Sequence, residues 1–250
     1  MKQDGIEIRE ATTVEELSEC VRLQQEVFGT PDLENSPVRH LIVSKYAGGW
    51  TLGAFAGGRM VGFVLSVPGF IGERRFFYSH MTAVARDFQN SGIGARLKWA
   101  QRERALSEGI DYIKWTFQPV QARNAFFNLE RLGATISVYE PNFYGTDYST
   151  SAEQDSVRGV DSDRLFADWY LDSPKVVALS KGEKYEETGK IVRKIEIPGN
   201  WNELVVANTA GAIAEQERIK REFQQAFAEN LICRGFERSE TNPKYLLFSE

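Results

Sequence analysis

The chain has 250 residues, of which 42% are hydrophobic and 26% charged, a balance typical of a soluble globular protein. Its formal net charge of −5 argues against a nucleic-acid partner, which would require a concentrated basic face. With only two cysteines and two histidines, the sequence excludes a disulfide framework and shows no zinc-ligand spacing, so no metal site is predicted. The polar N-terminus and the lack of a long apolar run predict a cytoplasmic enzyme with no membrane partner.

The N-terminal half predicts strands and helices in alternation. A short strand at residues 6–8 precedes an amphipathic helix, whose start is marked by residues 12–13 and 15–16 at the spacing of a capping box. Apolar runs on either side of Gly57 and Gly58 predict a β-hairpin, because glycine allows the positive φ of tight hairpin turns. The further predicted elements are strands at 76–84 and 112–117 and helices at 95–107 and 122–132. This order indicates an α/β domain.

The C-terminal half is less regular. The predicted strands are 136–139, 165–171, 176–179, 191–197 and 245–248, and an amphipathic helix is predicted around 219–227. The lysine- and glutamate-rich residues 181–190 form the only plausible linker. We therefore predict a domain over residues 1–180 and a C-terminal α/β extension over residues 181–250, packed on the same sheet.

The most informative segment is residues 89–94, a Q-x-x-G-x-G loop between a predicted strand and a predicted helix. A pyrophosphate needs several backbone N–H groups directed at one point, and a helix N-terminus supplies them with a favourable dipole. Glycine at positions 92 and 94 lets the backbone approach the phosphate closely. The structural alternative is a simple helix-start turn. A P-loop is excluded because Ala95 and Arg96 follow Gly94, and a dinucleotide fingerprint would open the chain instead of following a hairpin.

Two segments resemble motifs of one enzyme family. Residues 84–97 are similar to the acetyl-CoA-binding motif of GNAT (GCN5-related N-acetyltransferase) enzymes, whose core is Q/R-x-x-G-x-G/A, and residues 124–134 resemble the family's asparagine-bearing helix that ends in Leu-Gly-Ala. Residues 79–81, 123–125, 142–145 and 163–165 resemble a bacterial branch of predicted GNAT acetyltransferases with no assigned substrate. The resemblance implies a mixed, mostly antiparallel central sheet flanked by helices.

The resemblance also implies a set of contacts with acetyl-CoA, or with another acyl-CoA. The strand positions Thr82, Ala83 and Val84 would contact the pantetheine. Asn124 would contact the pantetheine or the thioester. The pyrophosphate would be bound by the backbone amides of Gln89, Asn90, Ser91, Gly92, Ile93, Gly94 and Ala95.

Direct acyl transfer needs a base for the amine, donors for the oxyanion and a proton for the thiolate. His80 is the candidate base, with Glu73 as a distant second and a structural, hydrogen-bonded histidine as the alternative. The resemblance places the oxyanion donor at the amide of Val84 or Ala83. Leu129 stands where the family commonly has a tyrosine that acts as the general acid. Tyr144 is then preferred over Tyr139 and Tyr148, unless the thiolate leaves without protonation.

Residues 139–163 are long for a loop in a compact domain, and such loops often form binding elements. We assign a substrate-binding role to residues 142–144 and a solvated role to most of the acidic residues. The predicted reaction transfers an acetyl group to an amine, on a small molecule or on an exposed chain, by direct attack. The alternatives are a non-catalytic acyl-CoA sensor or scaffold, and O-acyl or longer-acyl transfer. The extension completes the sheet, forms a half-GNAT appendage or builds a homodimer interface.

Overall fold

The computed structural model describes residues 5–29, 32–146, 148 and 159–249. Within these ranges the chain forms two compact units, the first reaching to Lys114 and the second starting at Trp115. The β5 strand (Tyr112–Phe117) begins in the first unit and ends in the second. The domain boundary predicted at residues 180 and 181 remains a prediction.

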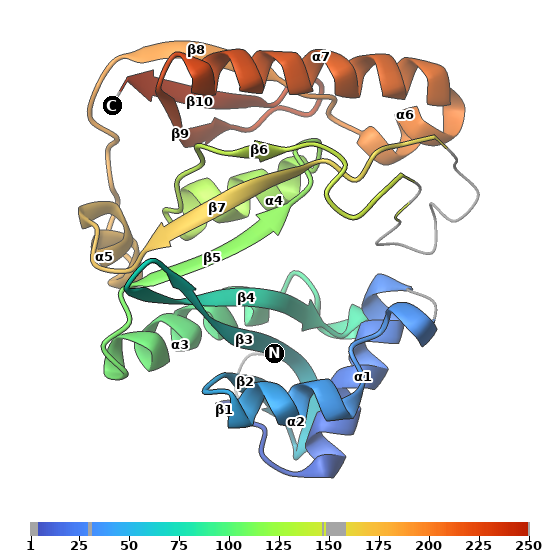
Figure 1. The fold of residues 1–250 in the computed structure, drawn as a ribbon, viewed down its shortest axis with the longest axis vertical. Helices are drawn as coiled ribbons and strands as arrows, with labels where there is room; N and C mark the ends of the chain where they lie inside the picture. The colour runs from blue at the N-terminus through green and yellow to red at the C-terminus, as the bar shows by residue number, and fades with distance from the viewer. Residues whose placement is uncertain (1–4, 30–31, 147, 149–158, 250) are drawn as a thin grey trace. The chain divides into compact units, whose positions relative to one another are not determined.

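The first unit is a twisted sheet covered by three helices (Figure 1). The strand order is β1-β2-β3-β4, followed by the start of β5. Neighbouring strands are antiparallel except for β4 and β5, which are parallel. Its remaining elements are β1 (Ile6–Glu10), α1 (Val14–Phe28), α2 (Val38–Tyr46), β2 (Trp50–Ala56), β3 (Arg59–Ile71), β4 (Arg74–Val84) and α3 (Ile93–Ser107).

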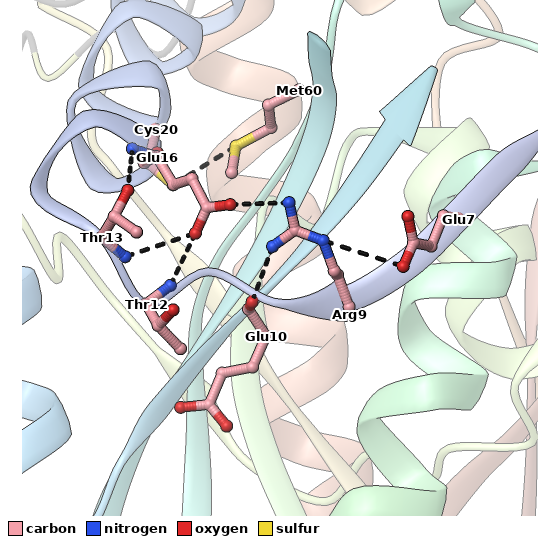
Figure 2. A network of polar contacts seen from close by, with 8 residues as sticks. All are labelled: Glu7, Arg9, Glu10, Thr12, Thr13, Glu16, Cys20 and Met60. Atoms are coloured by element: carbon pink, nitrogen blue, oxygen red, sulfur yellow. Dashed lines mark hydrogen bonds and ion pairs between the residues drawn. The ribbon is translucent and has the colours of Figure 1, made fainter. Parts of the chain in front are cut away.

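The start of α1 confirms the predicted capping box. The Thr13 hydroxyl accepts a hydrogen bond from the Glu16 amide, and the Glu16 carboxylate in return accepts one from the Thr13 amide (Figure 2). The same carboxylate pairs with Arg9 of β1 at 2.6 Å, and this interaction lowers the pKa of Glu16. The cap therefore fixes both the first turn of α1 and its attachment to the edge strand.

The sheet of the first unit buries both of its faces. On one face, Leu17 and Leu23 of α1 and Leu41 of α2 pack with Phe63 and Ala83 of the sheet. On the other face, α3 packs so closely on β3 that a Cβ at Gly62 would lie 3.3 Å from Leu97. The prediction of a hairpin at residues 50–67 is confirmed, although β3 continues beyond Pro68 to Ile71.

The second unit contains the end of β5 and two further groups of strands, in the orders β5-β7-β6 and β8-β10-β9. A π-helical turn over Phe127–Arg131 continues α4. The elements are α4 (Ala122–Phe126), β6 (Tyr139–Glu140), β7 (Arg164–Tyr170), α5 (Pro174–Ser180), β8 (Ile191–Glu196), α6 (Trp201–Ala207), α7 (Thr209–Ala228), β9 (Leu231–Glu237) and β10 (Lys244–Ser249). Together the two units confirm the mixed, mostly antiparallel sheet flanked by helices.

The C-terminal strands form a sheet of their own. It is attached within the second unit by a bridge between Cys233 and Ile136 and by the Glu130 carboxylate, which accepts the Phe236 amide at 2.6 Å. The α7 side chain Phe223 contacts the Tyr245 ring at 5.0 Å between centroids. The strand predicted at 176–179 is wrong: the segment lies in α5, because Pro174 occupies the first helical turn, where its fixed φ favours a helix.

Candidate active site

The strand β4 carries a β-bulge at His80. Ser66 of β3 pairs with Ser79, whereas the preceding β3 residue Leu65 pairs with Met81, so His80 is an extra residue with no partner on β3. The parallel pairing with β5 joins Phe77 and Tyr78 of β4 to the first residues of that strand, just before the bulge. The bulge therefore lies just after the residues of β4 that pair with β5.

Beyond the bulge, the hydrogen-bond alternation separates the three predicted pantetheine positions. The Ala85 amide donates to the Val61 carbonyl at 2.9 Å. In an antiparallel ladder every second residue repeats this direction, so the Ala83 amide also points to β3. The amides of Thr82 and Val84 therefore face the opposite edge of β4. The Val84 carbonyl lies on that edge too, since it accepts the Gln89 side chain at 3.2 Å.

The segment after β4 forms a tight, anchored loop. One 3-10 turn (Arg86–Phe88) is held to α1, where the Glu26 carboxylate accepts the Arg86 amide at 2.9 Å. Asn90 and Gly92 then adopt φ values of +60° and +81°. Such conformations favour asparagine and glycine and allow the chain to reverse before the helix starts. The predicted Q-x-x-G-x-G loop is thus a built turn at the N-terminus of α3.

The first turn of α3 has backbone donors without an intrahelical partner and a glycine with clearance around it. The Arg96 amide donates to the Gly92 carbonyl at 3.1 Å and starts the intrahelical bonds. The amides of Ile93, Gly94 and Ala95 precede that first bond and point out of the helix. A Cβ added at Gly94 would meet only Val84, at 3.9 Å. The loop therefore has both the donors and the clearance that a pyrophosphate needs.

His80 borders an open surface pocket of about 230 Å³, called the cavity below, whose wall includes His40, Val67 and Tyr78. The rings of His40 and His80 meet edge to face with centroids 6.0 Å apart. The Ser36 hydroxyl lies 3.5 Å from Nε2 of His80, at the limit of a hydrogen bond. The cavity thus gathers both histidines of the sequence.

Burial lowers the pKa of His80, and the charge of His40 lowers it further. The residue keeps exposed surface because one side of its ring meets the cavity, while the protein packed on its other sides removes water. A lowered pKa keeps the imidazole neutral at neutral pH, which is the form that accepts a proton. The role of His80 as a general base remains a prediction, and its lowered pKa and its place at the pocket are consistent with it.

His40 was missed in the sequence, because α2 was not predicted. Its nine residues carry a buried Leu41 and Ser44 but exposed apolar side chains such as Val43, so their pattern has little helical periodicity. The one available signal was composition. With two histidines in 250 residues, a shared location was worth proposing.

The remaining predicted residues lie in the second unit. Asn124 is exposed on α4, and Leu129 is fully buried in the π-helical turn, where it replaces the family's tyrosine. Among the tyrosines, the Tyr139 hydroxyl donates to Asp163 at 2.5 Å, and burial raises its pKa, which makes it a poor acid. Tyr144 is 41% exposed, and its amide is held by the Ser162 hydroxyl at 2.7 Å. The roles of Asn124 and Tyr144 remain predictions.

The comparisons with known proteins agree with this fold. Residues 13–134 match the family model of the acetyltransferase (GNAT) family. A protein from Desulfovibrio desulfuricans assigned to the GNAT family superposes with a TM-score of 0.54 at 16% identity, over 67% of this chain and 99% of that one. The Escherichia coli ribosomal-protein-S18-alanine N-acetyltransferase gives 0.52 at 14% identity, over 67% and 95%. A GNAT family acetyltransferase from Elizabethkingia anophelis, solved with acetyl-CoA bound, gives 0.50 at 16%, over 68% and 100%.

Residues 13–134 therefore match the acetyltransferase (GNAT) family, as the resemblance predicted, and the chain has the fold of that family. At these identities the solved structures establish the fold alone. No curated protein matches the sequence at a significant level.

Two further findings concern the described residues. None of their helices is long and apolar enough to cross a membrane. None of their histidine, cysteine, aspartate and glutamate side chains gather in a group of three or more that could hold a metal ion. The cytoplasmic location and the homodimer remain predictions.

Proposed function

We propose that this protein transfers an acetyl group from acetyl-CoA to an amine by direct attack. The observation that carries the proposal is the start of α3, where the amides of Ile93, Gly94 and Ala95 precede the first intrahelical bond beside the reversed loop, and where a Cβ at Gly94 would have clearance. The Elizabethkingia anophelis structure of the same fold has acetyl-CoA bound, which supports acetyl-CoA as the donor.

Acetyl-CoA would supply the activated acyl group, and the chain would bind it through two neighbouring segments. Residues 89–95 would hold the pyrophosphate by their backbone amides, with the α3 dipole adding to the attraction. The amides of Thr82 and Val84 face away from β3, so the Thr82 amide would hold the pantetheine while the Val84 residue contacts it and keeps its amide for the oxyanion. The Ala83 amide is directed at β3. Of the three predicted strand positions, Thr82 and Val84 therefore remain as those with outward-facing amides. Asn124 is proposed from the family motif only.

His80 would remove the proton from the acceptor amine. It lies at the cavity, and its lowered pKa keeps it unprotonated. Glu73, the second candidate, lies in the exposed turn between β3 and β4, where a carboxylate is ordinarily solvated. The outward-facing Val84 amide is the better of the two oxyanion donors considered, and one such donor contributes about 3 kcal/mol to transition-state stabilisation.

The acceptor class follows from the fold only broadly. The Escherichia coli neighbour is named for an alanine of a ribosomal protein, which illustrates an amine exposed on a chain. We propose a small-molecule amine or an exposed amine as acceptor, received at the cavity bordered by His40 and His80. Tyr144 would supply the proton to the departing thiolate, or the thiolate would leave without one.

A thermal-shift titration tests the donor. Acetyl-CoA, CoA and longer acyl-CoAs are titrated against the chain and against Gly94→Glu, whose carboxylate would repel phosphate. A ligand at a hundred times its Kd stabilises a protein by about 2.7 kcal/mol. We expect a dose-dependent rise in Tm that the variant loses, and a screen of amines for thiol release then identifies acceptors. No rise with any CoA species would refute the proposal, and binding without turnover on any amine would refute its catalytic part.

A further inference from the structure

Four polar side chains are buried together between the sheet and α3 of the first unit. They are Ser66 of β3, Ser79 of β4, and Lys98 and Gln101 of α3, each with at most 5% of its surface exposed. A lysine is almost never fully buried in a protein. Burial lowers the pKa of the Lys98 amine well below its ordinary range. The cluster is therefore a costly feature that packing alone does not require.

The four side chains form one hydrogen-bond network. The Lys98 amine donates to Gln101 Oε1 at 2.7 Å and to the Ser79 hydroxyl at 3.0 Å. The Gln101 amide group donates to the Ser66 hydroxyl at 2.8 Å and to the Ser79 hydroxyl at 3.1 Å. From α3, the Gln101 side chain thus contacts both β3 and β4, and the Lys98 side chain contacts Ser79 of β4 as well.

The network lies directly beside the bulge. Ser66 and Ser79 are register partners, and His80 follows as the extra residue before the next pair, Leu65 and Met81. A slip of one residue would turn every later side chain of β4 to the other face. Met81 and Ala83 would then leave the core formed with α1 and α2. The bulge is what allows Ser79 to face α3 while Met81 faces the opposite core.

We propose that this network is a positioning device, which clamps β3 to β4 beside the bulge and thereby holds His80 at the wall of the cavity. Ser66, Ser79, Lys98 and Gln101 are positioning residues, because they act through His80 and its backbone. The inference rests on the proposed role of His80 as the base, but its structural part can be tested without any acceptor.

The two histidines make that test direct, because their imidazole Hε1 signals can be separated by NMR and assigned with His40→Gln and His80→Gln. Lys98→Met and Ser79→Ala remove parts of the network and leave the groups that face His80 in place, namely His40 of α2, Tyr78 of β4 and the Ser36 hydroxyl. The matched control is Lys175→Met, a change at a half-buried lysine of α5 that donates to the Arg234 carbonyl at 2.5 Å.

We expect both network variants to shift the His80 signal and to raise its pKa toward the ordinary histidine value. Lys175→Met should leave both histidine signals unchanged. Ser79→Ala removes one hydroxyl and retains the bond between Lys98 and Gln101, so it keeps the test valid if Lys98→Met does not fold. An unchanged His80 signal and pKa in the folded variants would overturn the proposal.

The titration with acetyl-CoA separates this inference from the proposed function. Binding of acetyl-CoA together with an unmoved His80 would reject the positioning role alone. If the network variants shift the His80 signal but the protein binds no CoA species, the proposed function is rejected and the positioning role of the network stands. If an acceptor is found, the network variants should lower kcat at least tenfold and leave the stabilisation by acetyl-CoA intact.

Discussion

β4 and β5 each run into a helix, and the two junctions use their polar groups in opposite ways. After β4, the chain reverses through Asn90 and Gly92, and the first amides of α3 have no intrahelical partner. After β5, the Pro119 carbonyl accepts the Tyr245 hydroxyl at 2.6 Å, and the neighbouring Val120 is buried. The first junction is the proposed pyrophosphate site, whereas the second is contacted by the chain's own C-terminal sheet.

The glycines of the two units show the same contrast. A Cβ at Gly94 would meet one atom, at 3.9 Å, and the residue needs no positive φ. Gly133 has a φ of +76°, and a Cβ there would lie 3.1–3.3 Å from side chains of Lys175, Val176 and Leu179. We therefore propose that Gly94 serves binding and that Gly133 serves folding. Substitution of Gly94 should change the affinity for acetyl-CoA, and substitution of Gly133 should change stability.

The largest effect is expected at His80. His80→Gln removes the base and should lower turnover of the acceptor found by the amine screen about 10²–10⁴-fold. The Tm rise with acetyl-CoA should persist, because the loop at residues 89–95 is unchanged. Turnover within twofold of the unsubstituted chain would contradict the role of His80.

The direction in which activity changes with pH follows from the lowered pKa of His80. The pKa of His80 is lowered, so the neutral base persists below the ordinary histidine pKa of about 6.5, and activity should decline only at lower pH. The same shift makes folding stability fall as pH drops through that window, since the unfolded chain binds the proton more readily. In His80→Gln, both the acidic limb of kcat/KM and this contribution to stability should disappear.

Gly94→Ala is expected to separate binding from folding. A methyl group fits the free protein, and an alanine in the first turn of α3 should raise stability by about 0.5–1 kcal/mol. The same methyl group occupies the space that the phosphate would approach, so the affinity for acetyl-CoA should fall roughly tenfold, or 1.4 kcal/mol. Calorimetric titration and thermal melting measure the two effects. Unchanged affinity would show that the loop is a structural turn.

The contrast also explains what the sequence could predict. The turn at residues 89–94 between a strand and a helix was predicted correctly because it depends on local features, whereas its role as a pyrophosphate site remains a prediction. The capping box of α1 and the hairpin were found for the same reason. The bulge at His80 was not predicted as such from the residues, because it depends on the pairing of Leu65 with Met81 on another strand. The proximity of His40 to His80 was not predicted either, because it depends on that strand pairing and on α2, which was not predicted.

The second unit was harder because its contacts join segments far apart in sequence. The bridge of Cys233 to Ile136 and the bond of Tyr245 to Pro119 leave no trace in either local pattern. The segment at residues 176–179 looked like a strand because it is short and apolar, a case that periodicity cannot resolve. Pro174 after Ser173 was the signal for a helix start that could have corrected it.

Gly133→Ala tests the proposed role of the second glycine in stability. A left-handed conformation costs an alanine about 1–2 kcal/mol, and the close side chains of α5 must also shift. We expect the free energy of unfolding to fall by about 1–3 kcal/mol. Acetyl-CoA should still raise the Tm of the folded variant, in contrast to Gly94→Glu. If Gly133→Ala were neutral in stability and impaired in binding, the division of roles between the two glycines would be wrong.

The last prediction concerns Tyr245→Phe, which removes the hydroxyl that contacts the second junction. The Pro119 carbonyl would lose its partner in a buried site, at a cost of about 1–3 kcal/mol. For a chain of this size each kcal/mol corresponds to a Tm change of about 2–4 °C. The exposed Tyr46→Phe is the matched control and should change stability by less than about 0.5 kcal/mol. Equal melting temperatures for the two variants would mean that packing of the Tyr245 ring against Phe223 and Phe236, without the hydroxyl, is enough to hold the C-terminal sheet to the β5–α4 junction.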